Sequence, residues 1–416
     1  MKPLFELEET LNNLDWKVLK IKRVLEIPIT DGPHETPEIL EEGIPFLSAE
    51  SVKKGKLNFG LKRGYISSED YEKYIKKCKP QRNDIFMVKS GATTGNVAMV
   101  ETDEEFSIWS PLALIRANQE KVLPRYLYYF IDSLAFREQV EISWSYGTQQ
   151  NIGMKVIENL FISLPPLFVQ SKLVNYIEKK VFEIDNLVTE KEKLIKLLEE
   201  NRQSIITEVV TKGLNPNVKM KDSGVEWIGE VPEHWKIVKL KYLTKMKSGE
   251  SIDSLDINSE GQYKVYGGGG FRGYTSKYTH TGEYLLIGRQ GALCGNVTFA
   301  SGEFWATEHA VVVETNYVDI RFLGYLLEGM NLNQYSISAA QPGLSVSTIL
   351  NLAVPMPAKN EQIELAAKLE EINVQTVQLI SDIQGEIQKL KEYRQSLIYE
   401  AVTGKIDVRD FEVEVE

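Results

Sequence analysis

Apolar residues recur at alternating spacings of four and three along two long stretches of the chain. The first stretch runs from Ile177 to Val209, and the second repeats it 192 positions later, from Leu369 to Ala401. This spacing is the heptad pattern of a coiled coil, so each stretch predicts one long helix with an apolar seam. The seam residues expected to pair the helices or to contact a partner are Ile184, Ile195, Leu198, Arg202, Ile380, Ile387, Leu390 and Arg394.

Each seam carries an arginine at the same position, in an Arg-Gln-Ser motif, Arg202 in the first helix and Arg394 in the second. A charge on a seam costs stability and tends to specify register. We therefore expect these two arginines to set the register of the helix ends or to contact a partner subunit.

A block of mixed pattern precedes each helix. In the first block, short apolar runs bounded by turn formers predict strands at 16–21, 43–47, 84–88 and 160–164, and an amphipathic pattern predicts a helix at 125–131. The second block repeats several landmarks of the first, whereas residues 22–85 and 241–285 share little. Blocks that share landmark motifs but differ in the segments between them indicate a duplicated binding module, in which one scaffold recognises two different ligands.

Turn-forming residues divide the chain. Gly213 and Pro216 stop the first helix, and residues 214–234 are expected to form a linker. The four glycines 267–270 lack the lysine and spacing of a phosphate-binding loop and are expected to form a flexible loop. The expected boundaries are 1–165 for the first block, 166–213 for the first helix, 214–357 for the linker and second block, and 358–416 for the second helix and an acidic tail.

Composition limits the class of protein. The chain has 416 residues, enough for more than one domain. It contains neither an apolar run long enough to span a membrane nor a signal-peptide pattern, so no membrane association is expected and the cytoplasm is the expected location. The two cysteines, Cys78 and Cys294, lie in different blocks, which argues against a disulfide framework or a zinc site.

The net charge of −11 argues against a nucleic-acid partner until its distribution is considered. Residues 53–89 hold eleven Lys and Arg against four Asp and Glu, and residues 236–247 hold five Lys and no acid. Local basic patches matter more for phosphate contact than the total charge, although solvated faces have the same composition.

Motifs of catalysis are missing from the sequence. It has no phosphate-binding loop and no His-Glu-x-x-His metal site, and the four histidines are scattered. Glu308 and His309 could form an acid–base pair but have no third partner nearby in sequence. We therefore expect a chain without a catalytic residue, a bound metal or a cofactor of its own.

Polar, glycine-bearing loops are the best candidates for binding. Arg, Gln and Asn pair with purine edges, whereas Lys, Ser and Thr suit phosphate oxygens. A single polar loop residue is more often a turn former, so the prediction of DNA contact rests on the groups of polar residues in these loops. The candidates for DNA contact are Lys53, Lys54, Lys89, Ser90, Thr93, Thr94, Asn96, Tyr146, Thr148, Gln149, Arg272, Tyr274, Arg289, Gln290, Asn296 and Gln341.

Three features together resemble the specificity subunits of type I restriction–modification systems. Residues 221–235, Lys-Asp-Ser-Gly-Val-Glu-Trp-Ile-Gly-Glu-Val-Pro-Glu-His-Trp, look like the entry into a target-recognition domain of that family. Residues 43–47 and 264–268 are similar to its early strand motifs, and the paired Arg-Gln-Ser endings are similar to its spacer helices. The resemblance covers essentially the whole chain.

The resemblance implies an α+β protein. Two duplicated mixed α/β target-recognition domains would be separated by two long antiparallel coiled-coil helices with pseudo-two-fold symmetry. Each domain would read one half of a bipartite site in double-stranded DNA, and helix length would fix the gap between the half-sites. About 40 helical residues span ~60 Å, against ~34 Å for one turn of DNA.

The resemblance also implies partners. Two methyltransferase subunits carrying S-adenosylmethionine would dock on the helices, and two restriction subunits, ATP-dependent translocases and nucleases that use Mg²⁺, would join them. Two alternatives remain open on the sequence: the specificity subunit of a type II system that cuts on both sides of its site, and a coiled-coil adaptor whose blocks bind protein.

Overall fold

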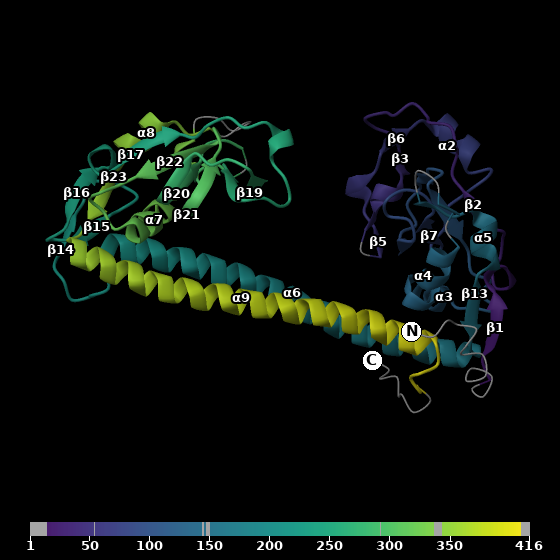
Figure 1. Cartoon of the computed structure of the whole chain (residues 1–416). Coiled ribbons are helices and arrows are strands. Elements are labelled where there is room, and N and C mark those ends of the chain that lie inside the picture. Colours follow the sequence, from purple (N-terminus) through teal and green to yellow (C-terminus); the bar gives the residue numbers. More distant parts are fainter. Residues whose placement is uncertain are drawn as a thin grey trace. The chain divides into compact units, whose positions relative to one another are not determined.

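The computed structural model describes residues 15–53, 55–143, 145–146, 150–291, 293–336 and 343–408, with only the backbone described at 145, 146 and 150. The chain divides into two compact units, one made of Met1–Glu190 with Glu386–Glu416 and the other of Lys191–Gly385. Each unit combines one mixed α/β block with a part of each long helix (Figure 1).

The first unit is built on a six-stranded sheet. Its strand order is β2 (Thr30–Asp31), β10 (Leu112–Ile115), β7 (Ile85–Val88), β8 (Val97–Met99), β5 (Lys56–Leu57) and β4 (Val52–Lys53). The central strands β7 and β10 are buried along their whole length, which explains their uninterrupted apolar sequences. A second sheet orders β6 (Gly64–Ile66), β3 (Ile44–Leu47) and β9 (Ser107–Ile108).

Helices and a short strand pair complete this unit. Strand β1 (Lys17–Lys20) pairs antiparallel with β13 (Phe161–Leu164), so the start and end of the block lie together. The remaining elements are α2 (Ser68–Tyr74), α3 (Pro124–Asp132), α4 (Leu134–Ile142), α5 (Met154–Asn159), β11 (Ser145–Tyr146), β12 (Gln150–Asn151) and the 3₁₀ turns η2 (Ile21–Arg23), η3 (Ala49–Ser51) and η4 (Phe59–Leu61). Strands expected at 16–21, 43–47, 84–88 and 160–164 and the helix expected at 125–131 are confirmed.

The second unit repeats this plan. Its six-stranded sheet orders β17 (Lys245–Ser248), β22 (Ala310–Glu314), β20 (His280–Gly288), β21 (Val297–Ala306), β18 (Tyr263–Gly267) and β19 (Gly270–Thr275). Strand β16 (Lys236–Lys239) pairs with β23 (Ala353–Met356) as β1 pairs with β13. The other elements are α7 (Ile320–Gly329), α8 (Val346–Asn351) and the 3₁₀ turns η5 (Leu240–Tyr242), η6 (Ser254–Asp256) and η7 (Leu332–Tyr335).

One hairpin recurs in both units but joins different sheets. Strand β18 runs parallel to the end of β21 and pairs with β19, and in the first unit β3 runs parallel to β9 and pairs with β6. The second unit includes this hairpin in its six-stranded sheet, whereas the first unit places it in the three-stranded sheet and adds β5 and β4 beside β8. The duplication therefore keeps this hairpin, and the β4–β5 pair belongs to the first unit.

The two long helices are α6 (Leu167–Lys212) and α9 (Lys359–Val402), of 46 and 44 residues. In the first unit Ile177 and Val181 of α6 share a core with Leu397 and Ala401 of α9. In the second unit the opposite ends meet, with Ile206 and Val209 in one core with Leu365 and Leu369. The helices are thus antiparallel, and the expected α+β class with duplicated mixed domains and two long helices is confirmed.

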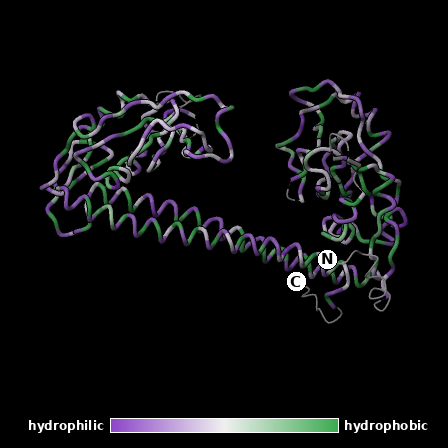
Figure 2. Tube along the Cα trace, viewed as in Figure 1, coloured by the Kyte–Doolittle hydropathy of each residue, from purple (hydrophilic) through white to green (hydrophobic). Residues whose placement is uncertain are grey.

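The seam pattern agrees with burial along both helices. All eight expected seam side chains are buried or half-buried, and hydrophilic and hydrophobic residues alternate along both helices in Figure 2. Helix α6 ends where the sequence indicates, because Gly213 has the positive φ of 76° that a helix C-cap requires.

The linker expected at 214–234 is a wrong prediction. Strands β14 (Met220–Asp222) and β15 (Glu230–Pro232) pair there as an antiparallel hairpin. Ile228 and Val231 are buried in the core of the second unit, next to Trp235. The turn formers of this segment mark the corners of a packed hairpin, which local composition does not distinguish from a linker.

The flexible loop expected at 267–270 is also wrong. These residues form a tight turn in which Gly267 pairs with Gly270 and joins β18 to β19. The turn is packed against its surroundings, since a Cβ on Gly268 would lie 2.9 Å from the carbonyl oxygen of His309. Glycine serves close backbone approach here, not flexibility.

Candidate nucleic-acid interface

Two loops have the same backbone frame in the two units. Loop 89–96 follows β7, and loop 289–296 follows β20. Each loop is closed by two backbone hydrogen bonds of 2.8 Å. In the first loop the amide of Val88 donates to the carbonyl of Asn96, and the amide of Gly95 donates to the carbonyl of Val88. In the second loop Gly288 makes the same two bonds with Asn296 and Gly295. The four glycines that make the turns possible have φ between 82° and 101°, at Gly91, Gly95, Gly291 and Gly295. The spacing of 200 residues seen in the sequence therefore reflects one repeated loop.

Each loop is held by a later segment of its own unit. The amide of Ile152 donates to the carbonyl of Lys89, and the amide of Leu344 donates to the carbonyl of Arg289, both at 2.9 Å. These contacts place Ser90 opposite Asn151 and Gln290 opposite Gly343 in isolated β-bridges. In the first unit, loop 89–96 thereby lies beside Asn151 and Ile152.

The first side chain of loop 89–96 is held inside the unit. Lys89 Nζ lies 3.2 Å from Asp31 Oδ2, and Lys77 Nζ lies 2.5 Å from Asp31 Oδ1. Burial raises the pKa of Asp31, but the hydrogen bonds from the two lysines outweigh it and hold the pKa below its ordinary value. The side chain of Lys89 is only 13% exposed, so its charge acts mainly in the ion pair with Asp31.

The corresponding side chain of the second unit has a neutral partner. Arg289 Nη1 donates to Ser248 Oγ at 3.2 Å. Ser248 ends β17 next to Val311, just as Asp31 ends β2 next to Ala113. The frame is conserved while the chemistry changes from an ion pair to a single hydrogen bond, which leaves more of the arginine's donors for a ligand.

The other candidates of loops 89–96 and 289–296 are accessible to different degrees. Thr93, Gln290 and Asn296 are exposed, whereas Ser90, Thr94 and Asn96 are half-buried. The hydroxyl of Thr94 donates to the carbonyl of Gly91 at 2.7 Å, a turn-stabilising contact. Lys53 is exposed on β4, away from loop 89–96 in sequence.

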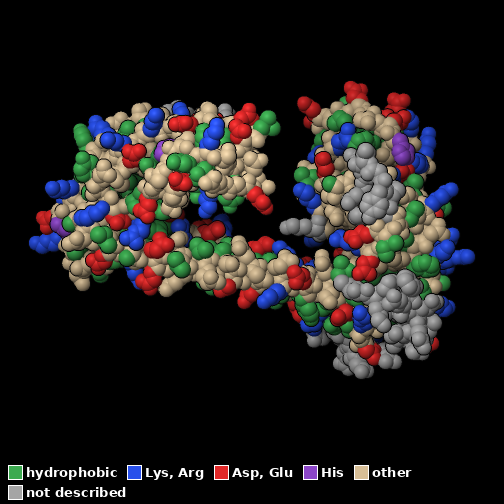
Figure 3. Space-filling model, viewed as in Figure 1, with side chains coloured by type: hydrophobic (Ala, Val, Ile, Leu, Met, Phe, Trp, Pro, Cys, Tyr) green, Lys and Arg blue, Asp and Glu red, His purple; other side chains and the backbone are tan. Residues whose placement is uncertain are grey.

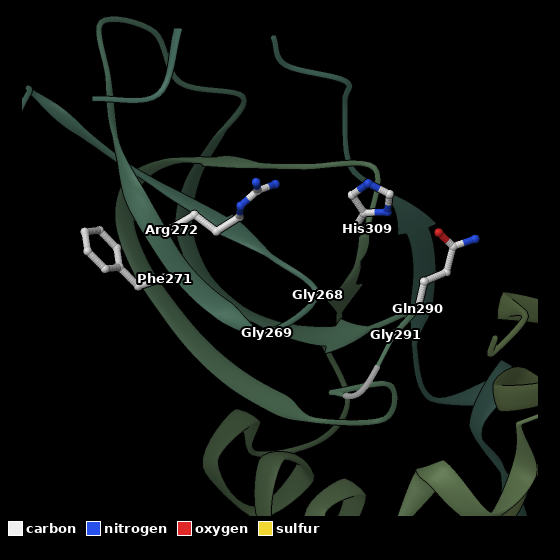
Figure 4. A pocket seen from close by; sticks show the side chains of 7 residues that line it. All are labelled: Gly268, Gly269, Phe271, Arg272, Gln290, Gly291 and His309. Carbon is white, nitrogen blue, oxygen red and sulfur yellow. The ribbon is translucent and has the colours of Figure 1, made fainter. Parts of the chain in front are cut away.

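Arg272 and Gln290 are brought together. A pocket of about 410 Å³ in the second unit is lined by Gly268, Gly269, Phe271, Arg272, Gln290, Gly291 and His309. Figure 4 shows the guanidinium of Arg272 directed toward the imidazole of His309. The sequence treated His309 only as a weak acid–base candidate, because the packing of the β18–β19 turn on 309 is not visible in local pattern. Tyr274, also on β19, is half-buried and does not line the pocket.

Several candidates cannot be placed. Lys54, Thr148, Gln149 and Gln341 lie outside the described residues, and Tyr146 is described by its backbone alone, in β11.

Aromatic rings hold three cations of the first unit that the sequence did not single out. Arg63 lies 3.7 Å from the ring centre of Trp109, and Lys62 lies 4.7 Å from that of Tyr65. Lys73 lies 5.7 Å from the ring centre of Tyr74. Stacked cations on a basic surface suit nucleic acid, and the run of Lys and Arg in 53–89 is the sequence signal for them.

A buried glutamine fixes each block to the start of a long helix. Gln170 Oε1 accepts from the amide of Leu123 at 2.8 Å, and Gln362 Oε1 accepts from the amide of Asp319 at 2.8 Å. Their Nε2 groups donate to the carbonyls of Pro165 and Pro357. The repeated contact ties a block helix, α3 or α7, to its long helix.

The seam arginines have partners within their own units. Arg202 Nη1 lies 2.7 Å from Glu328 Oε1 of α7, and its Nε donates to Asn373 Oδ1 of α9 at 2.7 Å. Arg394 Nε lies 3.2 Å from Asp185 Oδ1 of α6. Burial raises the pKa of Asp132 at the end of α3, and the charge of Arg394 partly offsets this. Arg202 thus links three helices, and Arg394 links α9 to α6.

Two further absences concern the described part of the chain. It holds no helix long and apolar enough to cross a membrane. Among the same residues, no group of three or more His, Cys, Asp or Glu side chains is placed to hold a metal ion.

Residues 13–208 and 232–389 match the family described as the type I restriction modification DNA specificity domain. The chain belongs to this family. The matched segments cover most of the chain and fall once in each block, so the duplication is a property of the family domain.

Relatives over the whole length agree. The specificity subunit of the type I restriction enzyme MjaVIII from Methanocaldococcus jannaschii is 24% identical over 95% of this chain and 94% of its own length. The specificity subunit of EcoprrI from Escherichia coli is 43% identical over a shorter match, 32% of this chain and 35% of that subunit.

A solved structure shares the fold. A chain from a structural study of complex assembly and conformational transition in a type I restriction–modification system superposes with a TM-score of 0.69 at 17% identity, covering 94% of this chain and 98% of that one. The long helices and the mixed domains are therefore those of a type I specificity subunit, and the type II and adaptor alternatives are not favoured.

Proposed function

We propose that the two domains of this specificity subunit each read one half of a bipartite target in double-stranded DNA. One observation carries the proposal: loops 89–96 and 289–296 have the same hydrogen-bonded frame but present different side chains. Ser90 in the first loop corresponds to Gln290 in the second, and Lys89 to Arg289. The shared backbone frame suits two loops that approach the DNA groove in the same way, and the different side chains suit two different base sequences.

The long helices supply a docking surface for partner subunits. Besides the protected seam, large apolar side chains are exposed on both helices, among them Phe182 (68% exposed), Leu197 (60%), Val374 (57%) and Val377 (55%). Figure 3 shows hydrophobic side chains among charged ones on the surface of the helices. Apolar residues exposed in this number mark protein contacts. We assign them to methyltransferase subunits, which bring S-adenosylmethionine, and restriction subunits that use ATP and Mg²⁺ complete the assembly.

The test is a half-site assay with reciprocal variants. The full chain is combined with its methyltransferase partner, and methylated positions are mapped on a random duplex library. Arg289→Ala and Gln290→Ala are expected to relax or weaken one half-site only, because their side chains belong to one loop. Ser90→Ala, at the position equivalent to Gln290, is expected to affect only the other half-site.

Three outcomes would count against the proposal. Both half-sites read unaltered by all three variants would remove the loops from recognition. A single variant that changes recognition of both half-sites would contradict the assignment of one half-site to each domain. Duplex binding that fails with and without the partner would favour the adaptor function.

A further inference from the structure

The pocket beside loop 289–296 is fixed by backbone packing. A Cβ on Gly288 would lie 2.1 Å from the carbonyl oxygen of Gly268, and one on Gly269 would lie 2.6 Å from Leu293 Cδ1. The turn between β18 and β19 therefore packs on the backbone at Gly288 and on the side chain of Leu293, with no space for a side chain at position 269 or 288. Such contact holds the pocket walls in place before any ligand arrives.

Arg272 is aimed into this pocket by a β-bulge. The register of β18 and β19 pairs Val265 with Gly273 and Tyr266 with Phe271, which leaves Arg272 as the extra residue. Bulges redirect a side chain and are enriched next to functional sites. The stem of Arg272 lies over Gly267, where a Cβ would come within 2.5 Å of Arg272 Cδ.

The donors of Arg272 are uncommitted. Across the described residues, its guanidinium makes neither a hydrogen bond nor an ion pair. The other arginines of this unit are engaged: Arg202 with Glu328, Arg289 with Ser248 and Arg321 with Asp319. Gln290 is exposed at the same pocket (Figure 4). The Nε2 atom of His309 lies 3.4 Å from Glu308 Oε1.

The first unit has a matching hairpin at the equivalent place. Strand β3 runs parallel to β9 and pairs with β6, as β18 runs parallel to β21 and pairs with β19. Phe46 pairs with Gly64 as Val265 pairs with Gly273, so Arg63 is the counterpart of Arg272. Arg63 lies 3.7 Å from the ring centre of Trp109, whereas Arg272 lines the pocket beside Gln290. The same position thus has different neighbours in the two units, which suits two different half-sites.

We propose that Arg272 reads a guanine in the half-site of the second domain, with the pocket receiving the major-groove edge of that base pair. Two parallel N–H groups of a guanidinium match O6 and N7 of guanine, and Gln290 stands at the wall where a neighbouring base would lie. The inference rests on the proposed function and adds a base identity and a residue to it.

A phosphate contact is the competing role for Arg272. Phosphate-binding arginines need only charge and an open surface, whereas this side chain is directed by a bulge into a glycine-walled pocket next to an amide. An amide offers both a donor and an acceptor, which base edges require and phosphate does not. The geometry therefore favours base reading.

The test compares Arg272→Ala and Arg272→Lys in the complete methyltransferase complex on a random duplex library. Lysine keeps the charge but loses the fork, so both variants are expected to lose discrimination at one guanine of one half-site, by roughly ten- to hundredfold. Gly267→Ala, which displaces the arginine stem without removing charge, is expected to have the same effect. Lys277→Ala, an exposed cation beyond β19, is the control and is expected to leave the motif unchanged.

Each other result overturns the inference. A uniform loss of methylation with the motif intact, restored by Arg272→Lys, would make Arg272 a phosphate anchor. An unaltered motif in both variants, or relaxation at a base other than guanine, would also overturn it while the proposed function stands. A wild-type complex that methylates no bipartite site would overturn both, and assembly with the methyltransferase, measured for every variant, separates misfolding from loss of reading.

Discussion

Arg202 shows how a charge is accommodated on a helix seam. Its side chain is 21% exposed, and its guanidinium has an acidic partner on α7 and an amide partner on α9. The sequence indicated that the seam arginines set register or contact a partner subunit, and the partners found here lie in the same chain. Arg202 therefore connects the block to both long helices, which is consistent with a role in setting the helix register. Contact of the seam arginines with other subunits stays a prediction.

Removing Arg202 should destabilise the second unit. Arg202→Ala leaves Glu328 without its charged partner, and hydrogen bonds to charged groups contribute about 1.5–3 kcal/mol, so a loss of that order is expected in urea unfolding. Glu328→Gln should cost less, and the double variant should cost less than the sum of the singles. Lys196→Ala, in an exposed pair on the same helix, is the control; strict additivity of Arg202 and Glu328 would show that their contact is not coupled.

Residues at equivalent positions can differ in function while their backbones agree. Lys89 and Arg289 both open a loop and both touch the last residue of the sheet's edge strand. The loop itself could be predicted from glycine and asparagine spacing. The partner could not, because Asp31 and Ser248 lie in the divergent segments and are brought close only by strand pairing.

Among the elements, the long helices were the most predictable. Their seam is a local pattern repeated over many turns, and Gly213 marks the end of α6. The edge hairpins were the least predictable, since strand order in a sheet depends on contacts between distant segments. The bulge at Arg272 belongs to this second class.

Helix α9 contains a glycine whose replacement by alanine should stabilise the chain. Gly385 is exposed, and a Cβ there would meet nothing within 4 Å. Because glycine in a helix interior costs about 0.5–1 kcal/mol relative to alanine, Gly385→Ala should stabilise the chain by that amount. The denaturant midpoint measures this, with Gly288→Ala as the opposite case, since its Cβ would clash with Gly268. A lower midpoint for Gly385→Ala would mean that the helix needs flexibility at this position.

For the whole molecule, the duplication gives one chain two similar backbone frames with different side chains on them. The family match and the full-length relatives place it among type I specificity subunits. A protein of this kind has both a DNA surface and a protein surface. The loops and the β18–β19 pocket supply the first in our proposal, and the exposed apolar side chains of α6 and α9 supply the second.

Charge placed on the docking surface should weaken assembly. Leu197→Glu puts a carboxylate where an apolar side chain is 60% exposed, so the amount of methyltransferase that co-purifies should fall. The stability of the isolated chain should change by less than about 0.5 kcal/mol, as for other exposed positions. Lys196→Glu, at the preceding residue, is the charge-change control and should keep its partner. Equal co-purification of both variants and wild type would place the docking surface elsewhere.

The sequence alone determined the features that repeat or have a short period. These are the two helices, their seam, the duplication of the blocks, the glycine loops and the resemblance to a family, all of which depend on neighbours within a few residues or on one copy matching another. Tertiary structure decided what depends on packing between distant segments. It turned the expected linker into a hairpin and the glycine run into a rigid turn, paired Lys89 with Asp31, and brought Arg272, Gln290 and His309 to one pocket, because strand order and close backbone approach are set by long-range contacts that no local pattern records.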